Sequence, residues 1–452
     1  MISAHDRYEM KDLTAWGDID VLVVGGGTTG VAAAISAARR GANVVIVERG
    51  IVLGGSQTQG LVMPMMPTNC AGSDTPFVSE VKEYLRRHGI EPSDGVTGTS
   101  WTNPDVLVEC YDEFASEAGV HVLYNATLFD VIVDGGVLST VLVQTIEGVV
   151  RIRARVFIDA TGDAMLARLA GVPCECGYEK TRHNQPMSYR FEMSGIDIER
   201  LYHYLKDELH DARCVTAPPY VEIGLARHRE MKYAVEPLFV QGIENGELAE
   251  DDAEYFQAFS VVGRPDTMAM NCPELPLKFS ASDAVSYSEG VTYGRASMRR
   301  IANFAKKHIP GFEHAYISRM ATMMGTRESW RIKGIAYLTE GDYHSERRFA
   351  DAVARTGYYI DAHGERVGEY LPAGAYYEIP YRAMVTHEAR NLIVAGRCIS
   401  VSFILQSSMR IQPTCMSIGE AAGIAAAWSA KNKIDANVLD WCDVPDRSYI
   451  SG

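Results

Sequence analysis

Residues 19–48 read IDVLVVGGGTTGVAAAISAARRGANVVIVE and decide the fold. The apolar run at 19–24 predicts a buried strand, which leads into a glycine-rich turn. The alanine-rich stretch that follows predicts a helix over 31–40, and a second apolar run predicts a strand over 44–47 that ends at Glu48. A strand, a turn, a helix and a second strand within one short unit predict a βαβ motif that binds a dinucleotide.

Each glycine of the turn has a mechanical reason. Gly25 permits the tight turn, Gly27 lets the backbone approach a pyrophosphate, and Gly30 lets helix and strand pack closely. The phosphates are expected at the helix N-terminus, where unpaired N–H groups and the helix dipole favour negative charge. Glu48 is then placed to accept hydrogen bonds from an adenosine ribose. Without the flanking strands the same glycines would indicate little, since a chance turn before an ordinary helix looks alike.

Composition limits the class of protein. With 452 residues the chain is long for one domain, so two or three interleaved domains are expected. The 43 basic and 58 acidic residues give a net charge of −15, which argues against nucleic acid or an anionic membrane as the main partner. The sequence has no apolar run of about 18 residues and no apolar signal segment at its start, so we expect a cytoplasmic protein with no membrane span.

The nine cysteines are scattered and never form a CxxC motif. This usage predicts reduced thiols and argues against an iron–sulfur cluster or a structural zinc. Cys174 and Cys176 form a CxC pair, but no second ligand pair follows at usable spacing. We therefore expect no metal site.

Changes in the pattern of apolar and polar residues along the chain predict its domain organisation. The segment 71–103 reads as an excursion from the sheet, and 104–118 reads as a helix. Alternating apolar residues before a buried strand at 156–158 predict a strand meander. Strand-like pieces such as 187–193 then mix with polar stretches such as 252–259, where a helix is expected. This change in the residue pattern indicates an inserted domain.

Three further segments turn a general dinucleotide site into a flavin site. Residues 156–163, VFIDATGD, form a buried strand that ends at the carboxyl edge of the sheet, where ligands of open α/β sheets bind. Thr161 and Asp163 can hydrogen-bond there, although Asp163 can equally cap a helix. Residues 391–400, NLIVAGRCIS, form a second such strand. Residues 413–430 begin with PTCM and predict a helix whose N-terminus would stabilise negative charge on the flavin pyrimidine edge, or a buried helix whose alanines and glycines only permit close packing.

Together these segments resemble the FAD-dependent oxidoreductases of the glutathione-reductase-like superfamily. The likeness is carried by the glycine-rich unit, FIDATGDAMLARLAG, GTRESWRIKG, IPYRAMV and NLIVAGRCIS followed by RIQPTCMSIGEAAGIAAA, and residues from about 195 to 315 carry little of it. The resemblance implies bound FAD with these residues in or near its site: Gly25, Gly27, Gly30, Glu48, Gly54, Gly55, Thr161, Gly162, Gly396 and Arg397. Many relatives carry an aspartate where this chain has Arg397, so a phosphate or a substrate acid is the expected partner of this arginine.

The predicted fold class is α/β, with a Rossmann-like FAD-binding domain and an inserted α+β substrate domain. The expected boundaries are 1–165 for the first part of the FAD-binding domain, 166–320 for the substrate domain and 321–452 for the returning part. Further candidate cofactor contacts lie beside those already named: Thr29, Arg49, Ser56, Thr58, Thr127, Ala160, Asp163, Thr414 and Met416.

Arginines gather in short polar segments in the second half of the chain. Their planar fork suits carboxylate or phosphate, which makes Arg327, Arg382 and Arg410 candidates for the substrate site. Arg327 and Arg331 are spaced to share a helical face, and Tyr381 offers a phenol for proton transfer. Ion pairing is the commoner role of any one arginine, and a core position is the commoner role of a tyrosine in such a strand.

The motif set predicts a flavoenzyme that moves a hydride between N5 of FAD and a carbon of a small polar substrate with a carboxylate or hydroxyl group. No second GxGxxG and no CxxC occur, so neither a separate NAD(P) domain nor a redox disulfide is indicated, and the electron partner stays open. A homodimer is a further expectation. Alternatives are an oxygen-using oxidase or monooxygenase and a non-catalytic electron-transfer subunit, while the net charge disfavours a tRNA-modifying flavoprotein. Isolated histidines such as His363 are expected to be structural.

Overall fold

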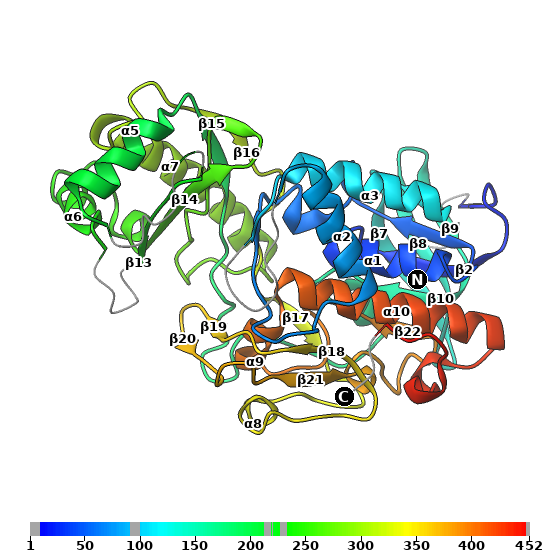
Figure 1. The fold of residues 1–452 in the computed structure, drawn as a ribbon. Coiled ribbons are helices and arrows are strands. Elements are labelled where there is room, and N and C mark those ends of the chain that lie inside the picture. The colour runs from blue at the N-terminus through cyan, green and yellow to red at the C-terminus, as the bar shows by residue number, and fades with distance from the viewer. Residues whose placement is uncertain (1–9, 91–99, 212–217, 219, 227–232, 449–452) are drawn as a thin grey trace.

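The computed structural model describes residues 10–90, 100–211, 218, 220–226 and 233–448 (Figure 1). Residues 91–99 of the predicted excursion and Cys214 lie outside the described residues. Figure 1 shows two lobes. One holds α5 to α7 and β13 to β16, and the other combines N-terminal segments (blue) with C-terminal segments (yellow to red).

A sheet of five parallel strands forms the centre of the larger lobe. In order across the sheet the strands are β22 (Leu392–Val394), β10 (Ala154–Asp159), β2 (Ile19–Val24), β3 (Val44–Val47) and β6 (His121–Leu123). The strands predicted at 19–24 and 44–47 are confirmed. Because β22 comes from near the C-terminus, this sheet joins the two ends of the chain.

The central sheet is covered on both faces, as its continuous apolar strands require. Val21 and Val23 of β2 face helices, whereas Leu22 and Val24 face a strand meander. The helices are α1 (Thr28–Ala38), α2 (Pro76–Arg87), α3 (Pro104–Ala118) and α10 (Gln412–Asn432). The meander consists, in sheet order, of β1 (Lys11–Asp12), β9 (Gly148–Ile152), β8 (Val137–Thr145) and β7 (Thr127–Asp134).

The smaller lobe is an antiparallel sheet with its own apolar core. In order its strands are β13 (Glu222–Ala226), β14 (Tyr255–Val261), β15 (Arg264–Met270), β12 (Phe191–Ser194) and β16 (Tyr316–Met320). Helices α5 (Ile198–His203), α6 (Glu236–Glu244) and α7 (Ala284–His308) contribute to the same core. The helix predicted over 252–259 is wrong, because Phe256 and Ala258 alternate with less buried neighbours and their strand pairs on both sides.

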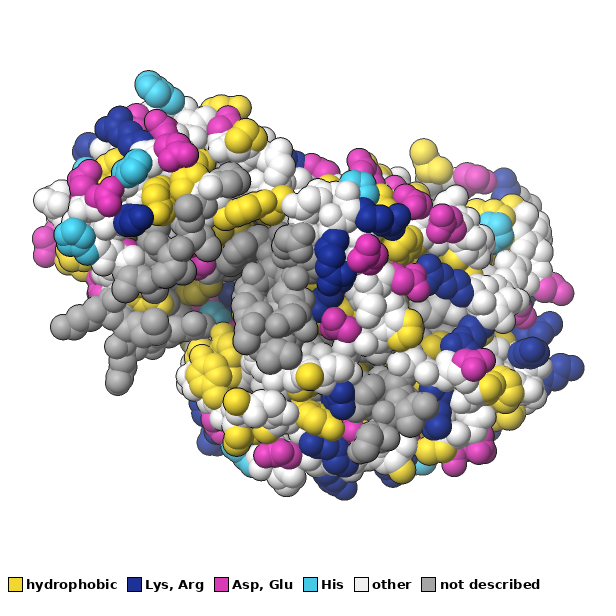
Figure 2. Space-filling model, in the orientation of Figure 1, with side chains coloured by type: hydrophobic (Ala, Val, Ile, Leu, Met, Phe, Trp, Pro, Cys, Tyr) yellow, Lys and Arg dark blue, Asp and Glu magenta, His cyan; other side chains and the backbone are white. Residues whose placement is uncertain are grey.

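Short elements complete the larger lobe. Four strand pairs are β4 (Pro64–Met65) with β5 (Ser100–Trp101), β11 (Cys174–Cys176) with β17 (Trp330–Ile332), β18 (Ala352–Thr356) with β21 (Tyr377–Pro380), and β19 (Ile360–Ala362) with β20 (Arg366–Glu369). Short helices are α4 (Met165–Leu169), α8 (Glu340–His344) and α9 (Phe403–Met409). Among the described helices none is long and apolar enough to cross a membrane. Lys and Arg side chains are interspersed with Asp and Glu over the described part of the face in Figure 2.

Helices α1 and α10 approach each other so closely that two positions of α10 require glycine. A Cβ atom added to Gly419 would lie 2.2 Å from the carbonyl oxygen of Thr29. One added to Gly423 would lie 2.1 Å from the carbonyl oxygen of Ala33. Both distances are far below van der Waals contact, and the atoms they reach are backbone atoms. A side chain at either position would therefore force the two helices apart as whole units.

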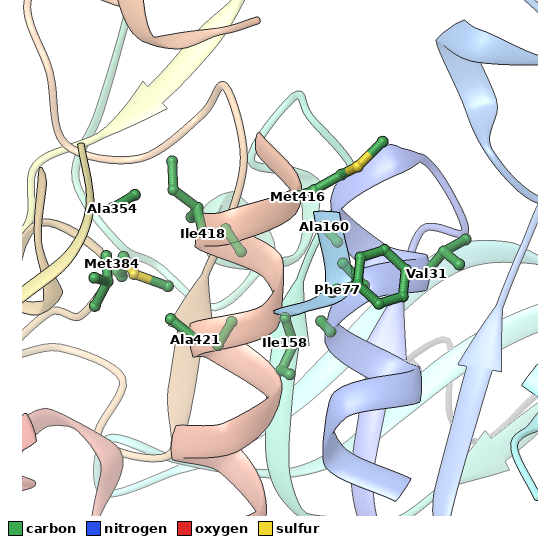
Figure 3. Packing of buried hydrophobic residues seen from close by; sticks show 14 of the residues in the cluster. Val31, Phe77, Ile158, Ala160, Ala354, Met384, Met416, Ile418 and Ala421 are labelled. Carbon is green, nitrogen blue, oxygen red and sulfur yellow. The ribbon is translucent and has the colours of Figure 1, made fainter. Parts of the chain in front are cut away.

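Apolar side chains surround this helix pair (Figure 3). Val31 of α1, Ile158 of β10 and Ala160, which directly follows β10, lie on one side of α10, and Ile418 and Ala421 belong to α10 itself. All five are buried in one continuous core. The glycines therefore set how close the helices come, and the surrounding core holds them there.

We expect Gly423→Ala to lower the free energy of unfolding by about 3 kcal/mol, because the new methyl group overlaps backbone of α1. Urea or thermal unfolding measures the change. Gly341→Ala at an exposed position of α8 is the control, since its added Cβ meets only Thr339 Oγ1 at 3.4 Å. Equal stabilities of the two variants would contradict the close approach.

Candidate active site

The turn between β2 and α1 uses its glycines for two different purposes. Gly25 has a φ of +100°, and a Cβ atom on it would lie 2.6 Å from the carbonyl oxygen of Ala160. A Cβ atom on Gly30 would lie 1.8 Å from the carbonyl oxygen of Gly25. Gly27 differs, since its φ is −73° and an added Cβ atom would meet no heavy atom within 4 Å. The fold therefore needs Gly25 and Gly30, whereas Gly27 borders open space.

The N-terminus of α1 is left without a cap. Gly27 is its N-cap residue, no side chain accepts from the first N–H groups, and the first turn contains no acidic residue. The loop after β3 lies against this turn, because Thr28 Oγ1 donates to the Gly54 carbonyl at 3.2 Å. Gly54 has a φ of +97° and Gly55 a φ of +54°. Free N–H groups beside open space at a helix N-terminus fit a pyrophosphate.

Glu48 connects the turn to the end of β3. Its side chain is only 5% exposed and accepts from the Gly26 N–H at 2.8 Å and the Gly50 N–H at 2.7 Å. The Ala126 N–H donates to the Glu48 carbonyl, which brings the start of β7 at Thr127 beside this residue. A carboxylate held at this point fits the ribose end of an adenine dinucleotide.

The remaining candidates of this region differ in exposure. Thr58 is buried and its Oγ1 donates to the Leu53 carbonyl at 2.6 Å, which shapes the loop. Ser56 is half-buried in the same loop. The side chains of Arg49 and Thr127 are exposed. Thr58 therefore has a structural partner, and the other three border solvent.

The ATGD turn after β10 is organised by a buried carboxylate. Asp159 accepts from the Thr161 N–H at 3.0 Å, the Thr161 hydroxyl at 2.7 Å and the Ala167 N–H at 2.9 Å. Burial raises the pKa of Asp159, although these three donors oppose the effect. Gly162 follows with a φ of +75°. Asp159 therefore fixes the turn together with Thr161, whose Oγ1 accepts from the Asp163 N–H at 3.3 Å and the Met165 N–H at 3.0 Å.

Arg397 braces the same turn through contacts within the protein. Its Nε donates to the Gly162 carbonyl at 2.8 Å, its Nη2 lies 2.5 Å from Asp163 Oδ1, and its Nη1 donates to the Thr326 carbonyl. Asp163 also accepts from the Ser329 hydroxyl at 2.5 Å. All three nitrogens of the guanidinium are engaged within the protein, so no phosphate or substrate acid is required as a partner.

The N-terminus of α10 is a second uncapped helix end. Its N-cap residue is Ile411, no side chain accepts from the first turn, and no acidic residue lies there. Thr414 Oγ1 is buried and has no hydrogen-bond partner among the described residues. Gln412 lies beside Gln57, with 3.0 Å between the two amides. An uncapped N-terminus with an unused buried hydroxyl fits an electronegative edge of a ligand.

Gly396 and Met416 lie where α1 and α10 approach each other. Gly396 has a φ of +93°, and an added Cβ atom would lie 2.7 Å from Thr29 Oγ1. Met416 of α10 is fully buried in the core that includes Val31 of α1 (Figure 3). Both residues therefore serve the close approach of the two helices.

Open glycine backbone, two uncapped helix ends and an acid after the second strand define a dinucleotide-binding protein whose site draws on both ends of the chain. A family model described as FAD dependent oxidoreductase matches residues 20–446. The chain belongs to this family, and its cofactor is FAD. The predicted α/β fold class with a Rossmann-like FAD-binding part is thereby confirmed.

Known proteins of several activities are similar to the chain. Thiamine thiazole synthase from Methanococcus aeolicus is 29% identical over 162 residues, which cover 33% of this chain and 57% of that relative. The flavin-dependent brominase Bmp2 is 13% identical with a TM-score of 0.48, covering 94% of this chain and 81% of its own. The p-nitrophenol 4-monooxygenase PnpA from Pseudomonas putida DLL-E4 is 12% identical with a TM-score of 0.48, covering 95% and 84%.

A cluster of largely buried charged side chains includes Arg410, the residue before the N-cap of α10. Its members come from five separated segments: Arg190, Glu274, Arg327, Asp361, His363 and Arg410. Arg327 Nη2 lies 2.8 Å from Glu274 Oε2, and Arg327 Nη1 donates to the Pro186 carbonyl at 2.6 Å. Arg410 Nη2 lies 3.4 Å from Asp361 Oδ2. The structure thus brings the predicted residues Arg327 and Arg410 together.

His363 joins the two carboxylates of this cluster. Its Nδ1 lies 2.8 Å from Glu274 Oε2 and its Nε2 lies 3.2 Å from Asp361 Oδ1. Burial disfavours the imidazolium, but Glu274 and Asp361 outweigh burial and Arg327, so the pKa of His363 is raised above 6.5. The expectation that His363 is merely structural missed these contacts, because its acidic partners are brought to it only by the fold.

A cavity of ≈ 780 Å³ opens beside the cluster. Its lining includes Pro186, Glu274 and His363, together with residues of the β19–β20 hairpin. Arg327 bonds to two of these lining residues and therefore lies directly behind the wall. A small polar molecule in the cavity would meet the buried cluster.

Two predicted catalytic residues have structural partners elsewhere. The Tyr381 hydroxyl donates to the Ala436 carbonyl at 2.9 Å, its ring stacks on Trp441, and burial raises its pKa. Arg382 pairs with Asp351 through two nitrogens, at 2.9 and 3.0 Å, and about half of its side chain is exposed. These contacts give both residues a role in packing rather than in the cluster.

The predicted helical face of Arg327 and Arg331 is wrong. Residues 325–329 are extended and Arg331 lies in β17, which pairs with β11. Arg331 is buried and pairs with Glu328, so it holds this segment in place. Among the described residues no group of three or more His, Cys, Asp or Glu side chains is arranged to hold a metal ion.

We expect Gly27→Ala to weaken FAD binding by at least about tenfold without unfolding the protein. Its added methyl group enters open space next to the free N–H groups of α1 and would collide with a pyrophosphate there. Flavin content after purification and the apparent Kd on reconstitution measure the effect, with thermal unfolding of the apoprotein as the control for the fold. Full flavin content in this variant would refute the pyrophosphate position.

We expect His363 to make stability depend on pH. Because its pKa is raised by folding, its contribution is present below pH 6.5 and is lost as the pH rises through the folded-state pKa. His363→Gln should therefore flatten the fall of unfolding free energy above pH 6.5, measured by urea unfolding across pH. The exposed residue His344, which pairs with Glu369 at 3.2 Å, provides the control variant His344→Gln. Parallel pH curves for wild type and His363→Gln would refute the pairing.

Proposed function

We propose that the chain is an FAD-dependent oxidoreductase of the glutathione-reductase-like superfamily that transfers a hydride between flavin N5 and a carbon of a small polar substrate with a carboxylate or hydroxyl group. One observation carries the proposal: Arg410 of the buried cluster directly precedes Ile411, the N-cap residue of α10. Charged groups suited to a polar substrate thus adjoin the helix end suited to the flavin. Bound FAD supplies the hydride acceptor or donor.

We assign different roles to the side chains of the cluster. Arg327 and Arg410 place positive charge beside the cavity, where it attracts the polar group of the substrate. His363 lies in the cavity wall and is held by two carboxylates, so it can hold or release a proton at the cavity. The first N–H groups of α10 stabilise negative charge on the cofactor side.

Several finer expectations belong to the same proposal. An FAD-binding domain of 1–165 and 321–452 is supported by β22, which joins β10 in the central sheet. A substrate domain of 166–320 is supported by the separate apolar core of the smaller lobe. The eight described cysteines are free thiols, which supports a cytoplasmic protein. A homodimer and an unidentified electron partner complete the proposal.

The test is anaerobic reduction of the bound flavin by a panel of hydroxy acids, amines, sugars and unsaturated acids. We expect at least one carboxylated or hydroxylated compound to bleach the flavin absorbance. Slow reoxidation in air would then indicate a dehydrogenase or reductase, and fast reoxidation an oxidase or monooxygenase. A purified protein without flavin, even after reconstitution, would refute the proposal.

With a substrate in hand, we expect Arg327→Met to lower kcat/KM by about a hundredfold or more, because a positioned charge next to the reacting group is lost. Steady-state kinetics of holoprotein with matched flavin content measures the loss. Arg295→Gln is the control, since Arg295 is exposed on α7 and outside the cluster. A kcat/KM of Arg327→Met equal to that of Arg295→Gln would exclude the role.

A further inference from the structure

Arg190 carries a buried positive charge that has no acidic partner. It directly precedes β12, is 9% exposed, and its Nε donates to Asn271 Oδ1 at 2.6 Å. Among the described residues no carboxylate lies within ion-pair distance of it, and no protein group accepts from either terminal nitrogen. Burial and then the charge of Arg327 lower the pKa of Arg190 to about 9, which leaves the guanidinium charged near neutral pH.

The surroundings fix Arg190 in place. Asn271 Nδ2 donates to the Tyr255 hydroxyl at 3.1 Å and to Gln257 Oε1 at 2.8 Å, so its oxygen is turned toward Arg190. A Cβ atom added to Gly325 would lie 2.5 Å from Arg190 Nη1. The Asn271 amide therefore holds the guanidinium of Arg190 over the backbone of Gly325. Within the described part of the chain, the two terminal nitrogens of Arg190 keep their hydrogen-bond donors unused.

Arg190 is the guanidinium of this cluster that lacks a carboxylate partner among the described residues. Arg327 pairs with Glu274 and Arg410 pairs with Asp361, whereas Arg190 bonds only to the Asn271 amide. A buried uncompensated charge costs free energy, and a bound anion removes that cost. One carboxylate matches both the charge and the fork of Arg190.

The cavity in front of the cluster has the opposite charge. Asp251, Glu254 and Glu365 line it in addition to Glu274. Asp251 accepts from the Tyr293 hydroxyl, Glu365 pairs with His183, and the lining Arg366 pairs with Glu340 and Glu369. A second anionic group on the substrate would lie among these carboxylates and be repelled. Apolar Leu277 and exposed Tyr370 complete the wall.

We propose that Arg190 binds the carboxylate of the substrate and that this substrate is a monocarboxylate whose remaining part is neutral or positively charged. The inference rests on the proposed function and names its substrate class. The carboxylate enters between Arg190 and the pair Arg327 and Arg410, and the rest of the molecule points into the acidic cavity. Arg190 thereby determines binding, and the cavity acids determine selectivity against dicarboxylates.

The test titrates the FAD-loaded protein with butanoate, 4-aminobutanoate, succinate and butylamine, and follows the perturbation of the flavin absorbance. We expect butanoate and 4-aminobutanoate to bind, with succinate at least about tenfold weaker and butylamine without effect at the same concentrations. Arg190→Met should weaken both carboxylates at least about tenfold, and Arg190→Lys should restore part of the affinity. The control Arg295→Gln should bind them as the wild type does.

Three results would overturn the inference. They are succinate binding as tightly as butanoate, carboxylate binding by Arg190→Met at wild-type affinity, and no perturbation by any carboxylate in a protein whose flavin is bound and can be photoreduced. If Arg190→Met fails to fold, the selectivity of the wild-type protein decides alone. Absence of bound flavin would instead refute the proposed function, so the two failures are distinguishable.

Discussion

The close approach of α1 and α10 is the contact on which the rest of the structure depends. Gly419 and Gly423 let α10 lie against the backbone of α1 at distances that any side chain would prevent. This contact joins a helix from the first tenth of the chain to one from the last tenth, and both pack on the central sheet. Because each helix begins at an uncapped N-terminus, the same contact sets the distance between the two ends that serve the cofactor. The distance between the N-termini of α1 and α10 is thus set by helix packing and not by a direct bond between the two ends.

The site leaves polar groups unsatisfied where the fold elsewhere satisfies them. Asp159 meets three donors and Arg397 uses three nitrogens, so the ATGD turn is complete without a ligand. The first turns of α1 and α10 and the fork of Arg190 are not complete. Such groups lower stability in a protein that binds nothing, and they become favourable when an anion or a polar edge arrives. The difference between satisfied and unsatisfied groups separates scaffold from binding surface within a few residues.

The sequence predicts the local parts of this arrangement well and the long-range parts poorly. β2 and β3 are found at their predicted positions because a buried parallel strand is a continuous apolar run, readable without its partners. The polar residues of 252–259 follow no regular alternation, so the sequence favours a helix there, and only pairing with β13 and β15 decides for a strand. Arg190 and His363 carry no sequence signal, since their neighbours in the cluster come from distant segments. Arg397 has a signal, but its partner Asp163 is supplied by the fold.

The position of Arg190 relative to α10 depends on how the two lobes are joined. Glu192, two residues further along the chain, is buried and pairs with Arg264 at 2.6 Å. Arg264 and Arg319 of the smaller lobe both pair with Asp105 in the first turn of α3. An acid at a helix N-terminus is favourable in itself, so Asp105 is stabilised by α3 and by both arginines together. This ion-pair network holds β12 against the larger lobe, and Arg190 directly precedes this strand. Precision in the site comes from ion pairs at the lobe boundary as much as from the residues that would touch a substrate.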